Sequence, residues 1–432
     1  MRISSTMMSG NYLKQLNGTY QQYSKLMEQS DGSKLHRASD DATGYSKYLR
    51  YQNNKITNEQ YQTNVSTASS WMKNADTALV NITDLLQTFK EKVEQSANST
   101  NNESDLKDIA KELLANVQEQ VADLNTQVGD RFLFSGQKDT TMPFEITSEK
   151  MARGETRTLD EKQQAFFSGS STWGSENTTL KQMLKLEGDD GNAYYMNVQT
   201  GDIFTEDFVE NGYKDAESFD PATQRVGNVA GFKTSDNFDQ YGVINATGEA
   251  FSQDITVDGE KVNLTFATTM QYIVKYNGDD KYISMVKKNG GVDQATDTVN
   301  VTGQDINGCD IFDADGDPAS GTALLNQLMY TVAKIDAGDY QWAGEEGMTI
   351  ADTAHANVLG AETKMAARQQ AYEAASGMLT TQNESITSDI SDVSSTDVAE
   401  LATKLMEYQT IYSLSLSVGA KILPGTLADY LS

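Results

Sequence analysis

The side chains best suited to acid, base or nucleophilic chemistry are scarce in this chain. Its 432 residues include two histidines, His36 and His355, and one cysteine, Cys309. A Ser/His/Asp or Cys/His arrangement needs a histidine near a nucleophile, and a zinc site needs histidines or cysteines at short fixed spacings. Neither histidine stands in such a motif, so we expect both to be packed or solvated. The sequence therefore predicts a protein that is not an enzyme and needs no cofactor.

An acidic cluster toward the end of the middle region is the main candidate for a metal site. Residues 310–321 read DIFDADGDPASG and carry four aspartates. An EF-hand loop requires a bidentate Glu at its twelfth position, but counting from Asp313 that position is Leu324. We favour a turn that leads into a helix, and we assign no metal ligand. Calcium binding between Asp313 and Asp317 stays open as the weaker alternative, and Cys309 receives no role.

Adjacent carboxylates at Asp40 and Asp41 stand directly before a long helical pattern, in the segment HRASDDATG. Two neighbouring carboxylates could serve as a general acid and a general base. Carboxylates at the start of a helix also accept hydrogen bonds from its free N–H groups and face the positive end of its dipole. We favour this capping role over acid/base chemistry.

The net charge of −28 is concentrated in the middle of the chain. Residues 141–350 contain 35 acidic and 15 basic side chains, whereas residues 1–140 contain 17 and 15. Such a surface repels phosphate, which argues against nucleic acid as a partner and suits a solvated outer domain. No apolar run is long enough to span a bilayer, and the N-terminus lacks the apolar core of a secretory signal. We therefore expect neither membrane insertion nor the general secretory route.

Both ends of the chain carry helical patterns with apolar residues at alternating spacings of three and four, as in a coiled-coil seam. The predicted seams of the first and last helices consist of Leu13, Leu16, Tyr20, Tyr23 and Met27, and of Val398, Leu401, Leu405, Tyr408, Tyr412 and Ile422. Ser415 and Gly419 fill the remaining positions of the last seam and predict close packing. A longer seam runs from position 65 to 93, and a heptad repeat runs from 358 to 393.

The middle of the chain changes to the period of two that is typical of strands. Asp258 and Gly259 stand between alternating segments in ITVDGEKVNLTF, and Asn277 and Gly278 stand between two others. Such pairs favour tight hairpin turns because both central residues need positive φ. We therefore predict an antiparallel β domain over about residues 141–320. Its topology, and whether it is one domain or two, do not follow from these signals.

The predicted fold is mainly α with an inserted β domain. An elongated antiparallel coiled-coil core is built from both chain ends, and the β domain faces outward. Residues 1–40 with 395–432 form terminal helices that are marginal when alone, because a short helix gains most of its stability from packing. Residues 41–140 with 321–394 form the long-helix bundle, and residues 141–320 form the acidic β-rich domain.

These segments together resemble the flagellin family, which comprises the bacterial flagellins and their relative, the flagellar hook-filament junction protein (hook-associated protein 3). The resemblance covers about residues 1–144 and 321–432, including MRISSTMM at the start and the long ending from Ser388. The matching positions of the segment after residue 34 are Ser39, Asp40, Asp41 and Gly44.

Two elements bear on which member of the family the chain resembles. GDRFLFSGQKDTTMPF, from Gly129, and the ending near residues 420–431 resemble the junction protein. The matching positions of the first are Phe132, Phe134, Gly136, Pro143 and Phe144. In junction proteins a proline commonly follows the paired aspartates, but here Ala42 follows, and Gly44 resembles flagellin.

The resemblance implies a structural role in the bacterial flagellum. In this family the N- and C-terminal helices pair with one another and with neighbouring subunits in a tubular assembly, and they are poorly ordered in the free monomer. The implied function is an adaptor ring, formed by self-association, between hook-associated protein 1 at the end of the hook and the flagellin filament. Export through the flagellar type III apparatus, a cytoplasmic export chaperone and an extracellular location at the hook-filament junction are implied with it.

Two alternatives from the same residues stay open. The chain could be flagellin, the self-polymerising filament subunit, or a secreted surface protein that carries an adhesin-like β domain on helical ends. Polymerisation of the purified protein alone would favour the first. A calcium-dependent melting temperature that maps to the aspartates near position 315 would favour the second.

Overall fold

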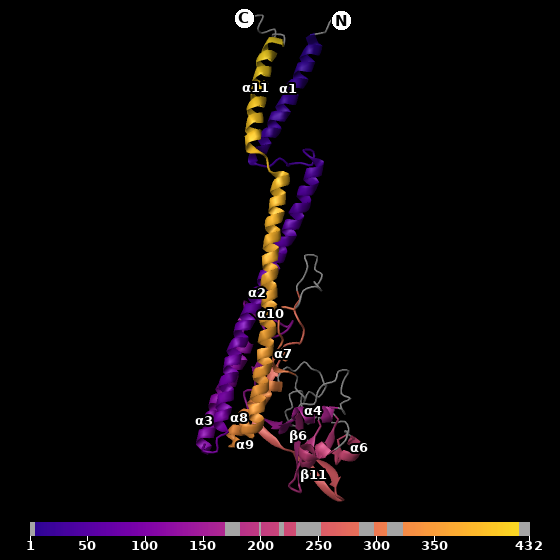
Figure 1. The fold of residues 1–432 in the computed structure, drawn as a ribbon, viewed down its shortest axis with the longest axis vertical. Coiled ribbons are helices and arrows are strands. Elements are labelled where there is room, and N and C mark those ends of the chain that lie inside the picture. The colour runs from indigo at the N-terminus through magenta and orange to yellow at the C-terminus, as the bar shows by residue number, and fades with distance from the viewer. Residues whose placement is uncertain are drawn as a thin grey trace. The chain divides into compact units, whose positions relative to one another are not determined.

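The computed structural model describes residues 5–168, 182–197, 200–215, 220–229, 252–284, 298–308 and 323–422. The chain divides into two compact units, one of Met1–Val65 with Ala374–Ser432 and one of Ser66–Glu373. Long helices come from both chain ends and strands come from the middle (Figure 1). The prediction of a mainly helical fold with an inserted antiparallel β domain is confirmed. Cys309, the aspartates at 310–317 and the ending from residue 423 lie outside the described residues.

The first unit contains two complete helices and parts of two longer ones. Helix α1 (Ser5–Glu28) packs against α11 (Val398–Ile422), and the start of α1 lies at the same end of this pair as the end of α11 (Figure 1). A 3-10 turn, η1 (Gln29–Asp31), follows α1. The N-terminal part of α2 (Ala42–Ser96) and the C-terminal part of α10 (Met348–Ser394) complete this unit.

The predicted seam of α2 is buried along its whole length. Each of its members is 5% exposed or less: Val65, Ala68, Met72, Ala75, Leu79, Ile82, Leu86, Phe89 and Val93. The heptad positions of α10 behave similarly, with Val358, Met365, Tyr372 and Ile386 buried. Alternating spacings of three and four keep these side chains on one face of a helix, which explains why local sequence determined them.

Helices α3 (Glu103–Leu124) and α8 (Ala323–Asp336) pack against each other in the second unit. Helix α3 begins with a capping box, in which the Asn102 side chain accepts from the backbone N–H of Asp105 and the Asp105 carboxylate accepts from that of Asn102. These two bonds satisfy N–H groups that a helix start otherwise leaves free. Two short helical elements, α9 (Tyr340–Trp342) and the π-helical η5 (Ala343–Gly347), precede α10.

The described strands, which fall between residues 127 and 276, form three two-stranded ribbons and one seven-stranded sheet, all antiparallel. The ribbons pair β1 (Gln127–Val128) with β2 (Arg131–Phe132), β3 (Phe144–Ile146) with β13 (Val274–Tyr276), and β4 (Met151–Gly154) with β12 (Thr268–Gln271). The sheet contains β5 (Thr156–Thr158), β6 (Gln182–Gly188), β7 (Ala193–Met196), β8 (Asp202–Thr205), β9 (Gly227–Asn228), β10 (Gln253–Val257) and β11 (Glu260–Phe266). Its order is β10-β11-β6-β7-β8-β9, and β5 also pairs with β6.

Short helical elements complete the middle region. They are α4 (Glu161–Ser168), the π-helical η2 (Phe208–Gly212), α5 (Tyr213–Asp215), α6 (Pro221–Gln224) and α7 (Gly303–Asn307). Among the helices of the described ranges, each is too short or too polar to cross a membrane.

One of the two predicted hairpins forms and the other does not. Asp258 and Gly259 have φ of 51° and 89° and join β10 to β11, so that prediction is confirmed. The hairpin at Asn277 and Gly278 is wrong, because β13 pairs with β3 and residues 277–284 contain no strand. The backbone N–H of Asn277 donates instead to the carbonyl of Pro143, at 2.8 Å. The turn signal predicted that β13 pairs with the residues directly after Gly278, but its partner is the distant strand β3.

Candidate functional site: the terminal helix pair

The predicted seam of α11 faces its partner helix along most of its length. Leu401 and Gly419 are buried, and Leu405, Tyr408, Tyr412 and Ser415 are half-buried. Val398, at the start of α11, is 68% exposed, and Ile422 is the last residue of the helix. The sequence pattern therefore located the inner face of α11, apart from its first position.

The inner face of α1 shares two positions with the predicted seam and differs from it by one residue at the other three. Leu16 and Tyr23 are half-buried, but Leu13, Tyr20 and Met27 are 47%, 53% and 49% exposed. The half-buried positions of α1 include the series Tyr12, Leu16, Thr19, Tyr23 and Leu26. They also alternate three and four, but they include a threonine. Apolar content alone therefore favoured the neighbouring stripe, and sequence reasoning missed Tyr12 and Leu26.

Tyr12 fills a notch that the small residues of α11 leave open. Its Oη donates to the Ser415 carbonyl at 2.7 Å. A Cβ added to Gly419 would lie 2.1 Å from the same Oη, so only glycine leaves room for the tyrosine. The predicted close packing at Ser415 and Gly419 therefore has a specific cause, which is a tyrosine hydroxyl bound to the backbone of α11.

A cluster of aromatic rings covers the middle of the same pair. The ring of Tyr412 lies 6.5 Å from that of Tyr23 in a nearly parallel arrangement, and 5.7 Å from that of Tyr20 at a tilt. Offset and tilted ring pairs contribute about 0.5–1.5 kcal/mol beyond burial. The pair is therefore held by aromatic contacts and one backbone-directed hydrogen bond.

The two connections that lead to this pair bind to each other. The backbone N–H of Lys34 donates to the Ser394 carbonyl at 2.7 Å, and that of Thr396 donates to the Gly32 carbonyl at 3.0 Å. Leu35, from the first connection, is 5% exposed. Two backbone hydrogen bonds thus connect the turn between α1 and α2 to the turn between α10 and α11.

Asp40 organises the first of these turns. Its Oδ2 accepts from the backbone N–H groups of His36 and Arg37, at 3.2 and 3.0 Å, and its Oδ1 lies 3.2 Å from the Lys25 ammonium of α1. Burial acts to raise the pKa of Asp40, but the hydrogen bonds from Arg37 and Lys25 outweigh it and hold this pKa below its usual value. Asp40 therefore fastens the turn to α1 and does not cap α2.

Asp41 caps α2. Its Oδ1 accepts from the Thr43 backbone N–H at 3.0 Å, and its carbonyl accepts from that of Tyr45 at 2.8 Å. A Cβ on Gly44 would lie 2.5 Å from the Asp41 carboxylate, so glycine leaves space for the cap. Ser39 is exposed in the turn. Adjacent aspartates thus have separate structural partners.

The aromatic motif after α3 lies in the second unit. Phe134, Phe144 and Pro143 are buried, Phe132 is 9% exposed, and the ring of Phe144 lies 5.1 Å from that of Tyr276. The Tyr276 hydroxyl donates to the Phe134 carbonyl at 3.0 Å. These contacts join the end of the helical region to the ribbons of the middle region.

Gly136 of this motif makes the closest approach. With φ of +69°, it lies so near Asp279 that an added Cβ would be 2.2 Å from the Asp279 carbonyl oxygen. The backbone N–H of the next residue, Gln137, donates to the Asp279 carboxylate at 2.6 Å. Glycine is therefore required both by the backbone conformation and by the contact.

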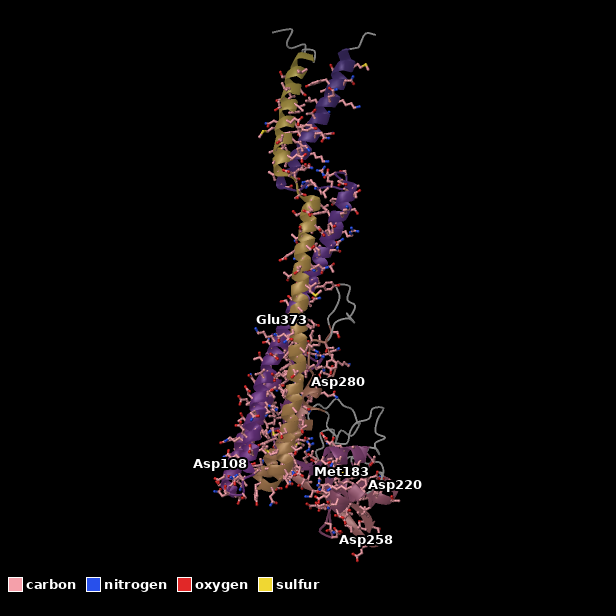
Figure 2. All side chains as sticks on the ribbon, in the orientation of Figure 1. Asp108, Met183, Asp220, Asp258, Asp280 and Glu373 are labelled. Carbon is pink, nitrogen blue, oxygen red and sulfur yellow. The ribbon has the colours of Figure 1, made fainter. Side chains whose placement is uncertain are left out.

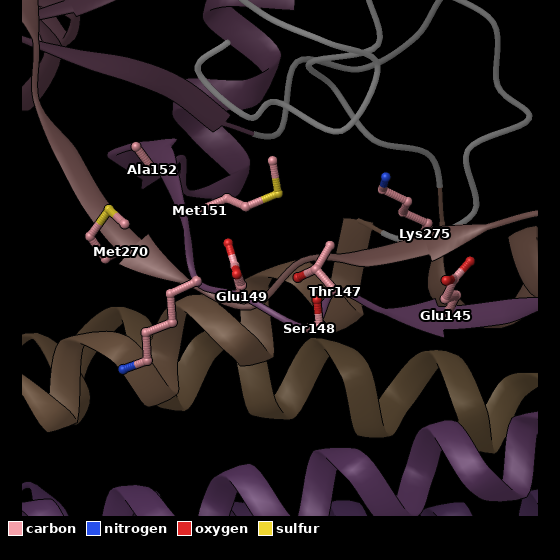
Figure 3. Close-up of a pocket in the computed structure, with 9 residues that line it drawn as sticks. Glu145, Thr147, Ser148, Glu149, Met151, Ala152, Met270 and Lys275 are labelled. Atoms are coloured by element: carbon pink, nitrogen blue, oxygen red, sulfur yellow. The ribbon is translucent and has the colours of Figure 1, made fainter. Parts of the chain in front are cut away.

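A separate open pocket of about 520 Å³ lies among the ribbons of the second unit (Figure 3). The residues that line it are Glu145, Thr147, Ser148, Glu149, Lys150, Met151, Ala152, Met270 and Lys275. Its lining contains neither histidine nor cysteine. In the described part of the chain, no group of three or more His, Cys, Asp or Glu side chains is placed to hold a metal ion.

The chain is similar to flagellar proteins from several bacteria. Residues 3–139 match the family model described as "Bacterial flagellin N-terminal helical region". Flagellin of Salmonella montevideo is 27% identical over 302 residues, which cover 58% of each chain. Flagellar hook-associated protein 3 of Salmonella typhimurium is 27% identical over 148 residues, which cover 34% of this chain and 46% of that protein. The matched region therefore spans less than two thirds of either relative.

Solved structures of similar proteins include a putative flagellar hook-associated protein from Vibrio parahaemolyticus, with a TM-score of 0.42 and 16% identity. The match covers 82% of this chain and 100% of that one. The flagellar junction protein FlgL from Legionella pneumophila gives a TM-score of 0.34 and 13% identity, over 76% and 98% of the two chains. Residues 3–139 carry the flagellin family's N-terminal helical region, and the predicted resemblance of the chain to the flagellin family is confirmed.

Proposed function

We propose that this protein is a structural, non-enzymatic subunit of the bacterial flagellum, and that it forms an adaptor ring between hook-associated protein 1 and the flagellin filament. The observation that carries the proposal is the packing of the first helix, α1, against the last, α11. The sequence match over residues 3–139 includes the whole of α1. The terminal pair is therefore the part of this chain that we assign to assembly.

Exposed apolar stripes on both helices support an assembly role. Leu13, Tyr20 and Met27 follow each other at intervals of seven residues on α1, and each is about half exposed. Helix α11 presents Ile411, Leu414 and Val418, which are 39%, 60% and 48% exposed. Apolar side chains at heptad spacing suit the seam of a further helix. We infer that helices of neighbouring subunits cover them.

A ring follows if these contacts are heterologous. One surface of each subunit then binds a different surface of the next, and the rotation between them closes laterally. In this proposal α1 and α11 form the innermost layer and the acidic sheet faces outward. The three-part division of the chain, with assembly helices from residues 1–40 and 395–432, belongs to the same proposal.

Exposed seams also bear on transport of the subunit. Apolar stripes of this kind invite aggregation before assembly. We propose that a cytoplasmic export chaperone covers α11, that the flagellar type III apparatus exports the chain, and that the mature subunit is extracellular at the hook-filament junction. Binding of the chaperone should then require the apolar face of α11.

Flagellin itself is the second candidate. Gly44, three residues after Asp41, resembles flagellin, and the flagellin match covers 58% of this chain against 34% for hook-associated protein 3. Flagellin polymerises with copies of itself, whereas a junction subunit needs a template at the hook. Sedimentation of the purified chain alone, without seeds, separates these possibilities.

Deletion of the gene tests the proposal directly. We expect the deleted strain to build hooks, to secrete flagellin monomer into the medium, and to regain filaments when the gene is restored. Loss of the major filament band itself would assign the chain to flagellin. Hooks that still carry filaments would contradict both candidates and leave a surface protein with flagellin-like ends.

A further inference from the structure

The seven-stranded sheet is a module within the middle region (Figure 2, which labels Met183 of β6 and Asp258 of the turn between β10 and β11). All seven strands fall within residues 156–266. Its buried core, which includes Phe167, Leu184 and Leu264, is also drawn entirely from these residues. A hydrophobic core of its own is a defining property of a domain, so we treat the sheet as one rigid module.

The chain enters and leaves this module at adjacent points. It enters after Glu155 and leaves at Ala267, and the backbone N–H of Glu155 donates to the Ala267 carbonyl at 2.7 Å. Lys185 of β6 completes a closed triangle, because its N–H donates to Glu155 and its carbonyl accepts from Ala267, at 2.6 and 3.2 Å. The module is therefore joined to the β4–β12 ribbon by two adjacent chain segments, one at Glu155 and one at Ala267. We call these two segments the neck.

The Glu155 side chain links the neck to helix α8. Its carboxylate forms an ion pair with the Lys334 ammonium of α8, and it also lies 3.6 Å from the Lys185 ammonium of the sheet. Lys334 lies in turn 3.6 Å from the Asp339 carboxylate and above the ring of Tyr330. The side chains of Glu155 and Lys334 are each 14% exposed. This pair is therefore far more shielded than the usual surface salt bridge.

The exposed pair Lys150–Asp336 offers a comparison at the same helix. Its atoms are 3.3 Å apart, but the two side chains are 43% and 42% exposed. Water and salt screen such a pair, and it contributes little to stability. Of the two ion pairs, only the Glu155–Lys334 pair includes a residue at the entry to the module.

We propose that Glu155 and Lys334 clamp the sheet module to α8, and that the seven strands and their buried core swing about the neck as one body when the pair is broken. Hinges of this kind consist of a few residues at the ends of elements, here Glu155 between β4 and β5 and Ala267 between β11 and β12. The core of the module stays intact during the motion because none of its members comes from α8. The clamp thus sets the orientation of the acidic module without contributing to its fold.

Distances between two spin labels test the clamp in the full chain. The labels are placed on exposed positions of α3 and β11, through Gln118→Cys and Lys261→Cys, in a chain with Cys309→Ser. We expect a narrow distance distribution for this parent chain. Glu155→Gln should broaden it, and Lys334→Met should do the same, while near-ultraviolet circular dichroism reports an intact module.

Two matched variants serve as controls. Asp336→Asn breaks the exposed pair at α8, and Lys185→Met removes the cation on the sheet side of Glu155 but leaves Lys334; both should keep the distribution narrow. A narrow distribution in Glu155→Gln, or a broad one in the parent chain, would overturn the proposal. If Glu155→Gln does not fold, Lys334→Met decides the outcome. If neither variant folds, the pair supports the fold itself and the clamp is wrong.

Discussion

Two glycines have nearly the same backbone conformation but differ in how much room they leave for a side chain. Gly129 and Gly136 have φ of +68° and +69°, in the left-handed region that other residues avoid. Nothing lies within 4 Å of a Cβ added to Gly129, whereas one added to Gly136 would lie 2.1 Å from the Asp279 carboxylate. The backbone conformation thus requires glycine at both positions, and contact adds a second requirement only at Gly136.

This difference predicts unequal costs for two alanine substitutions. Gly129→Ala should cost about 1–2 kcal/mol of unfolding free energy, because only the left-handed conformation is strained. Gly136→Ala should cost about 1–3 kcal/mol more, because the methyl group also displaces Asp279. Urea unfolding curves of the two variants measure the difference. Equal losses would contradict the close approach at Asp279.

The lowered pKa of Asp40 predicts that its hydrogen bonds to the turn depend on pH. The pKa of its carboxyl is lower in the folded chain than in the unfolded chain, where it is about 3.9. Its contribution to the turn is therefore present above the unfolded pKa and is lost as the pH falls through the folded pKa. The amide signal of Arg37 in a chain labelled with 15N-arginine should titrate with a midpoint below 3.9. Asp40→Asn should abolish this titration, whereas a midpoint above 3.9 would refute the assignment.

At the scale of elements, helix pairing depends on which face each helix turns inward. Helix α11 buries Leu401 and Gly419 toward α1, but it leaves Ile411 and Leu414 exposed. The pair is closed by tyrosines, since Tyr12 donates to α11 and Tyr412 contacts two rings of α1. An element with two apolar faces of which only one is covered suits assembly with further helices.

Charges on the inner face of α11 should therefore prevent assembly. Leu405→Asp with Tyr412→Asp places two carboxylates in the seam, where an unpaired charge is costly. We expect no filament growth when this variant is the sole copy in cells, while near-ultraviolet circular dichroism of the sheet module stays unchanged. Gln409→Asp, at an exposed position of the same helix, is the matched control and should support growth. Filaments with the double variant would show that this face has no role in assembly.

At the scale of the whole molecule, α2 belongs to both compact units, and its seam changes character between them. Within residues 42–64, all of which are described, only Asn58 is buried, whereas the seam from position 65 onward is apolar and closed. The Asn58 amide donates to Gln382 at 3.0 Å, but its Oδ1 has no hydrogen-bond partner. A buried carbonyl without a partner costs about 1–3 kcal/mol, so this part of the seam is weak.

The rate of hydrogen exchange should therefore differ between the two parts of α2, although the helix is continuous. Peptides from residues 42–64 should exchange faster than peptides from residues 66–93, because local opening requires less free energy where little apolar surface is buried. Asn58→Leu should slow exchange in the first segment by replacing the unpaired amide with an apolar contact. Asn54→Leu, at an exposed position, should leave it unchanged. Equal protection along α2 would show that the amide does not weaken the pair.

The sequence by itself determined the features that repeat along a segment. The inner faces of α2, α10 and α11 follow from spacings of three and four, and the turn at Asp258 follows from the backbone that Asp-Gly favours. Each of these depends on neighbours within a few residues, so the periodic pattern carries the necessary information.

Only the tertiary structure decided which distant partner each segment finds. It selected Tyr12 over Leu13 as the inner residue of α1, gave Asn277 a partner at Pro143, and placed Lys334 beside Glu155. The partners in these contacts are far apart in the chain. Packing, hydrogen bonding and ion pairing between elements determine these partners, because a contact between distant segments depends on how the whole unit folds and no local period encodes it.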